Sequence, residues 1–546
     1  MDKLIECVPN FSEGKDAAVI RQITDQIENV EGCKLLNTDP GKATNRTVVT
    51  FAGNPDSVVE AAFLAIKKAA ELIDMSKHKG EHPRMGATDV CPLIPLSGIT
   101  VEETVKYANA LAERVGRELQ IPVYLYEYAQ PNKKRSNLSD IREGEYEGYF
   151  KKIKLKEWKP DYGPDDFSAR SGATVIGVRD FLIAYNVNLN TKSVKRANSV
   201  AFDVRERGRM ITDAAGNQIQ QPGALKAVKA IGWYIDEYGQ AQVSMNLTDI
   251  NATPLHIAFD EVCKKAEERG LRVTGSELVG LVPLNSLTEA GKYFLLKQKC
   301  SAGVSETELI HIAIKSLGLD ELNKFEPADR IIEYCLQSPG KLAGLSLSQF
   351  ADKTASDSPA PGGGSVSAYL GALAASLGVM VANLSASKKG WENRLNEFSE
   401  AAENGQKIKA ALLKLVDEDT DAFNAILNAY KLPKITEQEK LKRKEAVQLA
   451  TRKAIESPFK VMQNALDALY LVRTMVQTGN PSSLSDGAVG ALCARSAIIG
   501  AHLNIKANAG SFNDKTWLNK LMEESRKIEA EAIMLEKEIL GLIDNK

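Results

Sequence analysis

The sequence predicts a multidomain protein, with an α/β region in its first part and an all-α helical bundle in its last part. Up to about residue 326, short β-type runs alternate with amphipathic helical runs, which is typical of sheets covered by helices. From Ser346 onward no strand-like alternation remains, and long helical runs follow one another as in a helical bundle. At 546 residues the chain is also too long for one hydrophobic core.

Hydrophobic periodicity and turn residues place the elements of the first part. The expected strands are residues 4–8, 47–51, 90–94, 123–126 and 278–282, with a hairpin over 231–247. The expected helices are residues 17–27, 56–73, 101–120, 194–207 and 256–269. Because the α/β rhythm restarts at residues 173–190, two units of similar plan are expected.

The second part reads as five long helices, over residues 365–385, 394–430, 438–477, 486–507 and 513–543. Between residues 318 and 344 the pattern weakens to that of a connector with a short helix. The expected domains are therefore residues 1–178 and 179–326, a linker at 327–345, and a helical domain at 346–546.

Composition excludes several classes of function. The formal net charge of -2 creates no long-range field that would attract nucleic acid or an acidic membrane. The seven cysteines are scattered and never spaced as CxxC, which favours a reducing, cytoplasmic location. Residues 369–386 are apolar over about the length at which a membrane helix is considered. Their alanines, glycines and serines favour a close-packed buried helix instead.

The densest polar cluster of the first part is the loop SKHKGEHPRMGATDVCP, residues 76–92. Histidine titrates nearest neutrality, so His82 is the candidate general base, with Glu81 or Asp89 as the group that orients it. The alternative is that these are exposed loop residues beside a strand. A metal site at His78 and His82 is disfavoured because no third ligand follows at a suitable spacing.

A second loop, YGPDDFSARSG at residues 162–172, leads directly into a strand. Its glycines, its serines and Arg170 would let backbone N–H groups approach a planar polar ligand or a carboxylate. The alternative interpretation is an ordinary inter-domain linker.

In the second part, DSPAPGGGSVSAYLGAL places Gly362, Gly363 and Gly364 directly before a helix that begins near Ser365. Free N–H groups at such a helix start favour an anion or a carbonyl-bearing ring. The motif is weak by itself, because glycine-rich entries to helices are common.

The helix over residues 411–430 carries one residue that breaks its pattern. Its apolar stripe consists of Leu412, Val416, Phe423, Ile426 and Tyr430. Asp419 occupies the stripe's missing position, so a carboxylate is expected on the inward face, where it is either functional or part of an ion pair. Asp417 and Asp421 lie off the stripe and are explained by a solvated face.

A last candidate lies in TGNPSSLSDGAVGAL, residues 478–492, where one long helix ends and another begins. Asn480, Ser485 and Asp486 are its polar candidates. Asp486 is a possible supporting carboxylate, and the alternative is that it only caps the helix.

Longer stretches of the first part resemble glutamate formimidoyltransferases. The resemblance rests on CVPNFSEG, HKGEHPRMGATDVCPLIP, GPDDFSARSGATVIGVRDFLIAYNVNL, IGWYIDEYGQAQVSMNL and GSELVGLVPL. It implies two ferredoxin-like subdomains around a groove that binds folate and the amino-acid donor. It also implies that His82 is the catalytic base. The family's folate-contacting segment matches residues 163–172, including Gly163, Pro164, Arg170, Ser171 and Gly172.

The second part resembles the formimidoyltetrahydrofolate cyclodeaminases, which are related to helical methenyltetrahydrofolate cyclohydrolases. The resemblance rests on SPAPGGGSVSA, VDEDTDAFNAI and TGNPSSLSD. It implies that an acidic residue within 417–419 serves as acid or base, and the stripe argument favours Asp419 over Asp417. Gly362, Gly363, Gly364 and Ser365 are then expected to contact folate.

Both halves in this order resemble the bifunctional formimidoyltransferase-cyclodeaminase family. The resemblance implies N-formimidoyl-L-glutamate and tetrahydrofolate, polyglutamylated in cells, as substrates, a ring-like homo-oligomer and no metal. Two alternatives remain for the helical half. It could be a cyclohydrolase acting on methenyl-folate, or a noncatalytic folate-binding or oligomerisation module.

Overall fold

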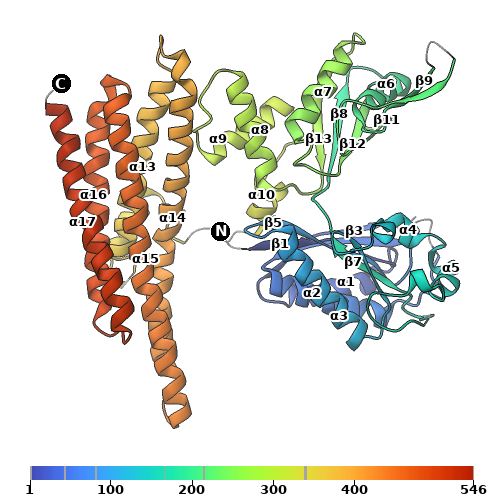
Figure 1. The fold of residues 1–546 in the computed structure, drawn as a ribbon, viewed down its shortest axis with the longest axis horizontal. Helices are drawn as coiled ribbons and strands as arrows, with labels where there is room; N and C mark the ends of the chain where they lie inside the picture. The colour runs from blue at the N-terminus through green and yellow to red at the C-terminus, as the bar shows by residue number, and fades with distance from the viewer. Residues whose placement is uncertain are drawn as a thin grey trace. The chain divides into compact units, whose positions relative to one another are not determined.

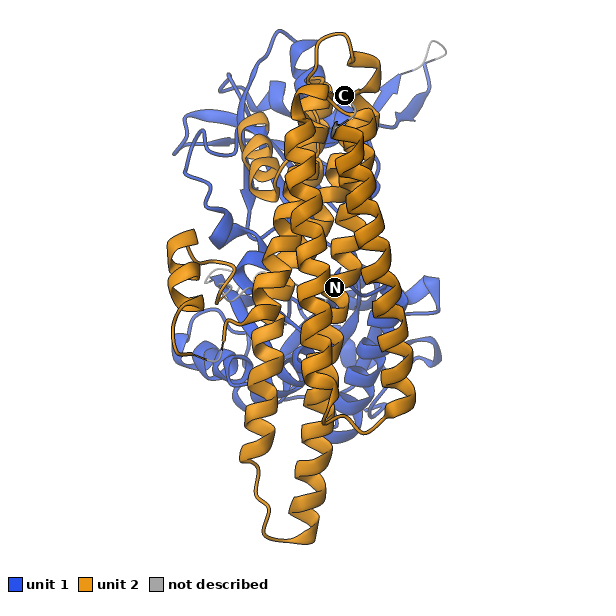
Figure 2. Cartoon of the chain, turned by 90° about the vertical axis from the view of Figure 1, so that its left-hand side faces the viewer, with its two compact units in different colours: residues 1–287, 317–337 blue, residues 288–316, 338–546 orange. Residues whose placement is uncertain are grey.

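The computed structural model describes residues 3–41, 45–79, 83–166, 168–212, 216–336, 341–358 and 360–544. The chain forms two compact units, residues 1–287 with 317–337 and residues 288–316 with 338–546 (Figure 2). The first unit contains sheets covered by helices and the second is helical, which confirms the predicted fold class. The proposed domain boundaries stay a prediction.

The first sheet has a ferredoxin-like core with two added strands. Its members are β1 (Leu4–Cys7), β2 (Asn10–Phe11), β3 (Cys33–Gly41), β4 (Arg46–Gly53), β5 (Thr88–Ser97), β6 (Val123–Glu127) and β7 (Thr174–Val178). Strands β1 and β2 act as one interrupted strand between β4 and β5, and these pairs are antiparallel. Strand β3 extends the sheet beyond β4, and β7 and β6 extend it beyond β5 with parallel pairing.

Three helices cover one face of this sheet. They are α1 (Ala17–Glu28), α2 (Pro55–Leu72) and α3 (Val101–Glu118), and each starts at a side-chain cap, provided by Asp16, Asn54 and Thr100. Ile5 and Cys7 of β1 join the core beneath them. Because side chains alternate along a strand, Glu6 points to the opposite face.

The second sheet repeats the ferredoxin-like order. It contains β8 (Ile183–Leu189), β11 (Val228–Ile235), β12 (Gln240–Leu247) and β13 (Val273–Val279), in the antiparallel order β11-β12-β8-β13. Helices α6 (Val194–Val204) and α7 (Leu255–Glu267) connect its strands, and the hairpin β9 (Arg209–Thr212) and β10 (Gln218–Gln221) follows α6. The implied pair of ferredoxin-like subdomains is therefore confirmed. The second subdomain starts at β8, because β7 belongs to the first sheet.

Among the helices that were not predicted are α4 (Leu138–Arg142), α5 (Glu145–Lys152), α8 (Leu284–Lys297) and α9 (Glu306–Leu317). Between residues 318 and 344, where a connector with a short helix was expected, the chain forms two, α10 (Pro327–Arg330) and α11 (Ile332–Leu336). The last two lie in the expected linker, where Ile331 is fully buried and bridges to Val282 after β13. Helices α4 and α5, with 5 and 8 residues, offer too few turns for a clear periodicity.

The long helices of the second unit run side by side as a bundle (Figure 1). They are α13 (Gly363–Ala386), α14 (Leu395–Lys431), α15 (Glu437–Thr478), α16 (Leu484–Ala509) and α17 (Lys515–Asp544), preceded by the short α12 (Leu347–Thr354). These bounds confirm all five predicted long helices to within a few residues.

Helix α13 is the centre of the bundle and packs against α14, α15 and α16. Its Gly371 lies against Leu412, and Gly378 lies against Leu471 and Val472, so small residues allow the close approach. Helix α13 and residues 481–509 are both long and apolar enough to span a membrane by composition. For α13, 61% of that stretch is buried inside the fold, which confirms the predicted buried helix.

Helices α14 and α15 continue past the ends of their neighbours as a two-helix hairpin (Figure 2). We call residues 425–450 the hairpin tip. Its seam consists of Ala429, Val447 and Ala450, which are buried against one another. Tyr430, predicted on the inward stripe, is 50% exposed, because only α15 remains to cover this end of α14.

Candidate functional site

In the first unit, two loops that were predicted separately lie against each other. The Ala87 N–H donates to the Ser171 carbonyl oxygen at 2.8 Å, and the Ala173 N–H donates to the Met85 carbonyl oxygen at 3.1 Å. A third bond joins the Met75 N–H to the Arg170 carbonyl oxygen at 2.9 Å. The loop of residues 76–92, called the histidine loop below, is therefore joined to the loop of residues 162–172 by backbone hydrogen bonds. His82 and Glu81 lie outside the described residues.

Two glycines allow this close approach. Gly86 and Gly172 face each other as a β-bridge. A Cβ atom on Gly172 would overlap the Met85 carbonyl oxygen, and one on Gly86 would overlap the Ala173 carbonyl oxygen. Gly172 also has a backbone φ of +64°, which residues other than glycine rarely adopt.

Replacing Gly172 with alanine is therefore expected to reduce the free energy of unfolding of the α/β half by about 1–3 kcal/mol. Formimidoyl transfer should fall with it, because the junction of the two loops shifts. Urea unfolding followed by circular dichroism checks the stability. Gly148→Ala is the matched control, since Gly148 lies in α5 and a Cβ there meets nothing within 4 Å. Equal stability of the two variants would contradict this reading of the junction.

Asp89 is completely buried at the base of the histidine loop. Its carboxylate accepts a hydrogen bond from the Met85 N–H at 2.9 Å and another from Arg142 Nε at 3.3 Å. Its partners in the described part of the chain are thus the loop backbone and a guanidinium. Asp89 therefore holds the turn that carries the loop, whereas its predicted role in orienting His82 stays a prediction.

Two further polar side chains of the loop, those of Arg84 and His78, are also anchored. Arg84 is 6% exposed and forms ion pairs with Glu145 at 3.0 Å and with Glu147 at 2.6 Å. His78 Nδ1 accepts a hydrogen bond from Arg84 Nε at 3.2 Å, while Nε2 lies 2.9 Å from the Asn45 carbonyl oxygen. With Nδ1 accepting from Arg84, Nε2 is the ring nitrogen that can donate to the Asn45 carbonyl oxygen. The alternative of exposed loop residues beside a strand is wrong for Arg84, which is buried, and His78 is half-buried.

The predicted folate-contacting residues of the 163–172 segment lie in different settings. Ser171 is buried, with its hydroxyl 2.6 Å from that of Ser168. Gly163 packs against the backbone of Gly116 and Ile121. Arg170 is exposed and donates to the Glu71 carbonyl oxygen at the end of α2, at 2.6 Å. Pro164 is half-buried beside them. Their contact with folate stays a prediction.

In the second unit, the predicted carboxylate and the predicted glycine-rich helix start meet directly. Ser365 Oγ donates to Asp419 Oδ2 at 3.4 Å, and the Ser365 N–H also bonds to this carboxylate. The same hydroxyl lies 2.9 Å from the Val416 carbonyl oxygen. A Cβ atom on Gly364 would overlap the Asp419 carboxylate, so only glycine lets the first turn of α13 come this close.

Two opposing effects set the pKa of Asp419. Burial raises it above the ordinary value for an aspartate, and the two hydrogen bonds from Ser365 lower it again. Burial is the larger effect, so the pKa is raised overall. A half-buried carboxyl of this kind takes up a proton more readily than an exposed aspartate does.

The start of α13 adds hydrogen-bond donors beside this carboxylate. Gly363 is exposed in the first turn, where backbone N–H groups have no partner within the helix. Asn504 of α16 lies beside Gly363 and donates to the Gly500 carbonyl oxygen at 2.8 Å. An acid–base group, helix N–H donors and an amide are thus gathered at one place. This combination suits a polar ring that must exchange a proton.

Both halves of the chain match models of known protein families. The model "Formiminotransferase domain, N-terminal subdomain" matches residues 4–179, and "Formiminotransferase domain" matches residues 184–337. The model "Formiminotransferase-cyclodeaminase" matches residues 346–527. Over 548 residues the chain is 42% identical to the formimidoyltransferase-cyclodeaminase of Mus musculus, covering 100% of this chain and 99% of the relative.

This chain belongs to the formimidoyltransferase-cyclodeaminase family. It is a bifunctional enzyme with a transferase half and a cyclodeaminase half. Its first half is 40% identical to the glutamate formimidoyltransferase of Streptococcus pyogenes, over 54% of this chain and 94% of the relative. Its second half is 30% identical to the methenyltetrahydrofolate cyclohydrolase of Methylorubrum extorquens, over 37% of this chain and 97% of the relative.

Within the cyclodeaminase half, the geometry separates Asp419 from Asp417. Asp417 accepts hydrogen bonds from the N–H groups of Leu342 at 2.7 Å and Ala343 at 3.4 Å. The prediction of a merely solvated face is wrong for Asp417, which ties down the chain that leads into the helical unit. Asp421 forms an exposed ion pair with Lys341 at 3.1 Å. Neither bonds to the start of α13.

The third candidate carboxylate of the cyclodeaminase half lies elsewhere. Asp486 is in the first turn of α16, and Ser483 rather than Asp486 occupies the cap position. Asn504, which borders Gly363, is 18 residues further along the same helix, about 27 Å along its axis. Asp486 and Asp419 of one chain therefore lie at opposite ends of α13, and a supporting role for Asp486 stays a prediction.

In the transferase half, the sequence reasoning missed polar residues on the sheet face opposite α1, α2 and α3. Arg46 donates to the side-chain oxygen of Asn10, and burial lowers the pKa of Arg46. Glu6 is 3% exposed, and desolvation raises its pKa to about 7, although Arg179 opposes the shift. The one available signal was the charge of Glu6 within an apolar strand, and this signal does not reveal burial.

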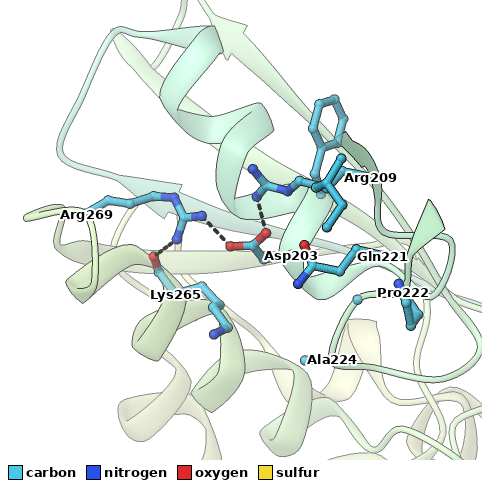
Figure 3. A pocket seen from close by; sticks show the side chains of 10 residues that line it. Asp203, Arg209, Gln221, Pro222, Ala224, Lys265 and Arg269 are labelled. Atoms are coloured by element: carbon cyan, nitrogen blue, oxygen red, sulfur yellow. Dashed lines mark hydrogen bonds and ion pairs between the residues drawn. The ribbon is translucent and has the colours of Figure 1, made fainter. Parts of the chain in front are cut away.

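A cavity of about 460 Å³ in the second subdomain contains none of the predicted residues (Figure 3). Asp203 lies between Arg209 and Arg269 and pairs with both. Lys265, the third cation of the lining, pairs with Glu268 at 2.9 Å. Each cation of the lining thus has a carboxylate partner within the protein, although one carboxylate, Asp203, serves both arginines.

Proposed function

We propose that this enzyme performs two consecutive reactions on one folate, with His82 and Asp419 as the respective proton-handling groups. In the transferase half, the formimidoyl group of N-formimidoyl-L-glutamate passes to N5 of tetrahydrofolate, which releases glutamate. In the cyclodeaminase half, 5-formimidoyl-tetrahydrofolate closes to 5,10-methenyltetrahydrofolate and releases ammonia. Histidine degradation supplies such a donor.

In the transfer step, N5 attacks the formimidoyl carbon and the bond from that carbon to the glutamate nitrogen breaks. His82 accepts the proton lost by N5 and returns it to the departing nitrogen. The described residues before and after His82 are anchored, His78 to the Asn45 carbonyl oxygen and Met85 to the Ala173 N–H. Residues 163–172 supply the neighbouring folate surface.

In the cyclisation step, the formimidoyl group reacts as its protonated amidinium form. N10 attacks the same carbon, and the bond from that carbon to the terminal NH2 nitrogen breaks. Asp419 accepts the proton from N10 and provides one to the departing ammonia. Ser365 holds one carboxylate oxygen, while Gly362, Gly363 and Gly364 let the ring approach the start of α13. The meeting of Asp419 with this helix start is the observation that supports the proposal most strongly.

The wider setting follows from the same proposal. The folate is used as a substrate, polyglutamylated in cells, and neither step requires a metal. The enzyme acts in the cytoplasm as a homo-oligomer, without nucleic acid or membrane as partners.

A two-product assay tests the proposed function. The purified chain receives formimidoylglutamate and tetrahydrofolate, and glutamate and ammonia are measured together with the absorbance of methenyl-folate. Equal amounts of both products are expected. A cyclohydrolase in the second half would instead consume added methenyl-folate and release no ammonia from 5-formimidoyl-tetrahydrofolate.

A further inference from the structure

The hairpin tip encloses a cavity that is lined by cations and by no carboxylate. Its volume is about 250 Å³. The lining residues come from α14, α15 and the turn between them, and they are Tyr430, Lys434, Lys440, Arg443, Lys444, Val447 and Gln448. Four of these seven are cationic, so the cavity itself is strongly positive.

Most of this charge is not neutralised by the protein. Lys440 pairs with Glu437 at 2.6 Å. In the part of the chain that the structure describes, Lys434, Arg443 and Lys444 form no ion pair. Arg443 places its guanidinium 5.6 Å from the ring centre of Tyr430, and its Nε is buried without a hydrogen-bond partner. Unpaired donors and gathered cations of this kind are stabilised by a bound anion.

The cavity and Asp419 lie along the same face of α14. Eleven residues separate Asp419 from Tyr430, which corresponds to a rotation of only about 20° and an axial distance of about 16 Å. Phe423 and Ile426 lie between them on this face and are half-buried. On this face of α14, one aromatic and one aliphatic side chain, both half-buried, therefore lie between the carboxylate and the cations.

We propose that the hairpin tip binds the carboxylate-bearing tail of the folate whose ring reacts at Asp419. This inference rests on the proposed function. A folate carries its pterin ring at one end and glutamate carboxylates at the other, with a benzoyl ring between them. The order along α14 matches this molecule: an acid–base group, an aromatic side chain, and then three unpaired cations.

The test has two arms. One removes cations from the hairpin tip, and the other removes the glutamate tail from the substrate. The double variant Lys434→Met with Arg443→Met is compared with Lys460→Met, an exposed lysine further along α15. Ammonia release is measured with 5-formimidoyl-tetrahydrofolate and with its analogue that lacks the glutamate. Circular dichroism and the thermal midpoint report whether each variant folds.

For the tail-bearing substrate, the double variant is expected to raise KM about tenfold, as for the loss of one charge-assisted hydrogen bond. Lys460→Met should not change KM. With the tail-free analogue, the double variant and the native enzyme should have the same KM. An unchanged KM for the tail-bearing substrate, or an equal rise for both substrates, would overturn the assignment.

The failure of this inference can be separated from that of the proposed function by Asp419→Asn. If Asp419→Asn abolishes ammonia release while the double variant keeps the native KM, only the proposed binding of the tail at the hairpin tip is wrong. If Asp419→Asn releases ammonia at the native rate, the ring does not react at Asp419, and both proposals are wrong.

Discussion

Asp419→Asn is expected to lower kcat for ammonia release by about 10²–10⁴-fold, the usual contribution of a general acid–base group. Asparagine keeps the shape of the side chain and can still bond to Ser365, but it cannot take up a proton. Glutamate release from formimidoylglutamate should continue at the native rate, since this step belongs to the other half. Separate assays of the two products measure both effects.

The pH dependence provides a second readout of the same residue. A base must be deprotonated to act, so the rate falls as pH drops through the pKa of Asp419. Because burial raises this pKa, the acidic limb of the kcat profile should lie above the ordinary range of an aspartate. Any residual activity of Asp419→Asn should lack that limb.

Stability distinguishes lost chemistry from lost folding. A raised pKa in the folded state means that this group favours folding at low pH and that the benefit is lost as pH rises through the folded value. At neutral pH the ionised carboxylate therefore lowers the free energy of unfolding. The Asp419→Asn variant should be at least as stable as the native protein. If Asp419→Asn releases ammonia normally, the helical half is a binding or assembly module and the proposed chemistry is wrong.

His82→Ala is expected to reduce formimidoyl transfer by about 10²–10⁴-fold and to leave ring closure of added 5-formimidoyl-tetrahydrofolate intact. The imidazole is the proposed carrier of the proton between the two nitrogens, and alanine offers no replacement. Stopped assays of glutamate release give the transfer rate, and the absorbance of methenyl-folate gives the closure rate.

His311→Ala is the matched control for this variant, because His311 is an exposed histidine on α9. It should change neither rate. His78 is unsuitable for the purpose, since both of its ring nitrogens hold the loop in place. Native transfer by His82→Ala would show that another group handles the proton.

Much of the architecture was predictable, because it depends on patterns within single segments. The long helices of the bundle repeat their apolar residues over many turns, which distinguishes them from strands without further information. Shorter elements were missed, among them β3 and α4. Strand β3 alternates exposed and half-buried residues with a proline in it, so its sequence resembles that of a loop.

The candidate sites were predictable one segment at a time. The stripe on α14 placed Asp419 on the inward face, which its half-buried position beside Ser365 agrees with. The same stripe was wrong for Tyr430, because the neighbours that would cover it end before the hairpin tip. Periodicity shows which face of a helix is apolar and says nothing about how far its neighbours extend.

By itself, the sequence determined the order of an α/β half and a helical half, the principal helices, and the segments that carry His82 and Asp419. Only the tertiary structure decided which segments meet: Gly364 with Asp419, Gly86 with Gly172, and the cations of the hairpin tip around one cavity. The physical reason is that local patterns reflect whether a side chain is buried, whereas its partners depend on how distant segments pack.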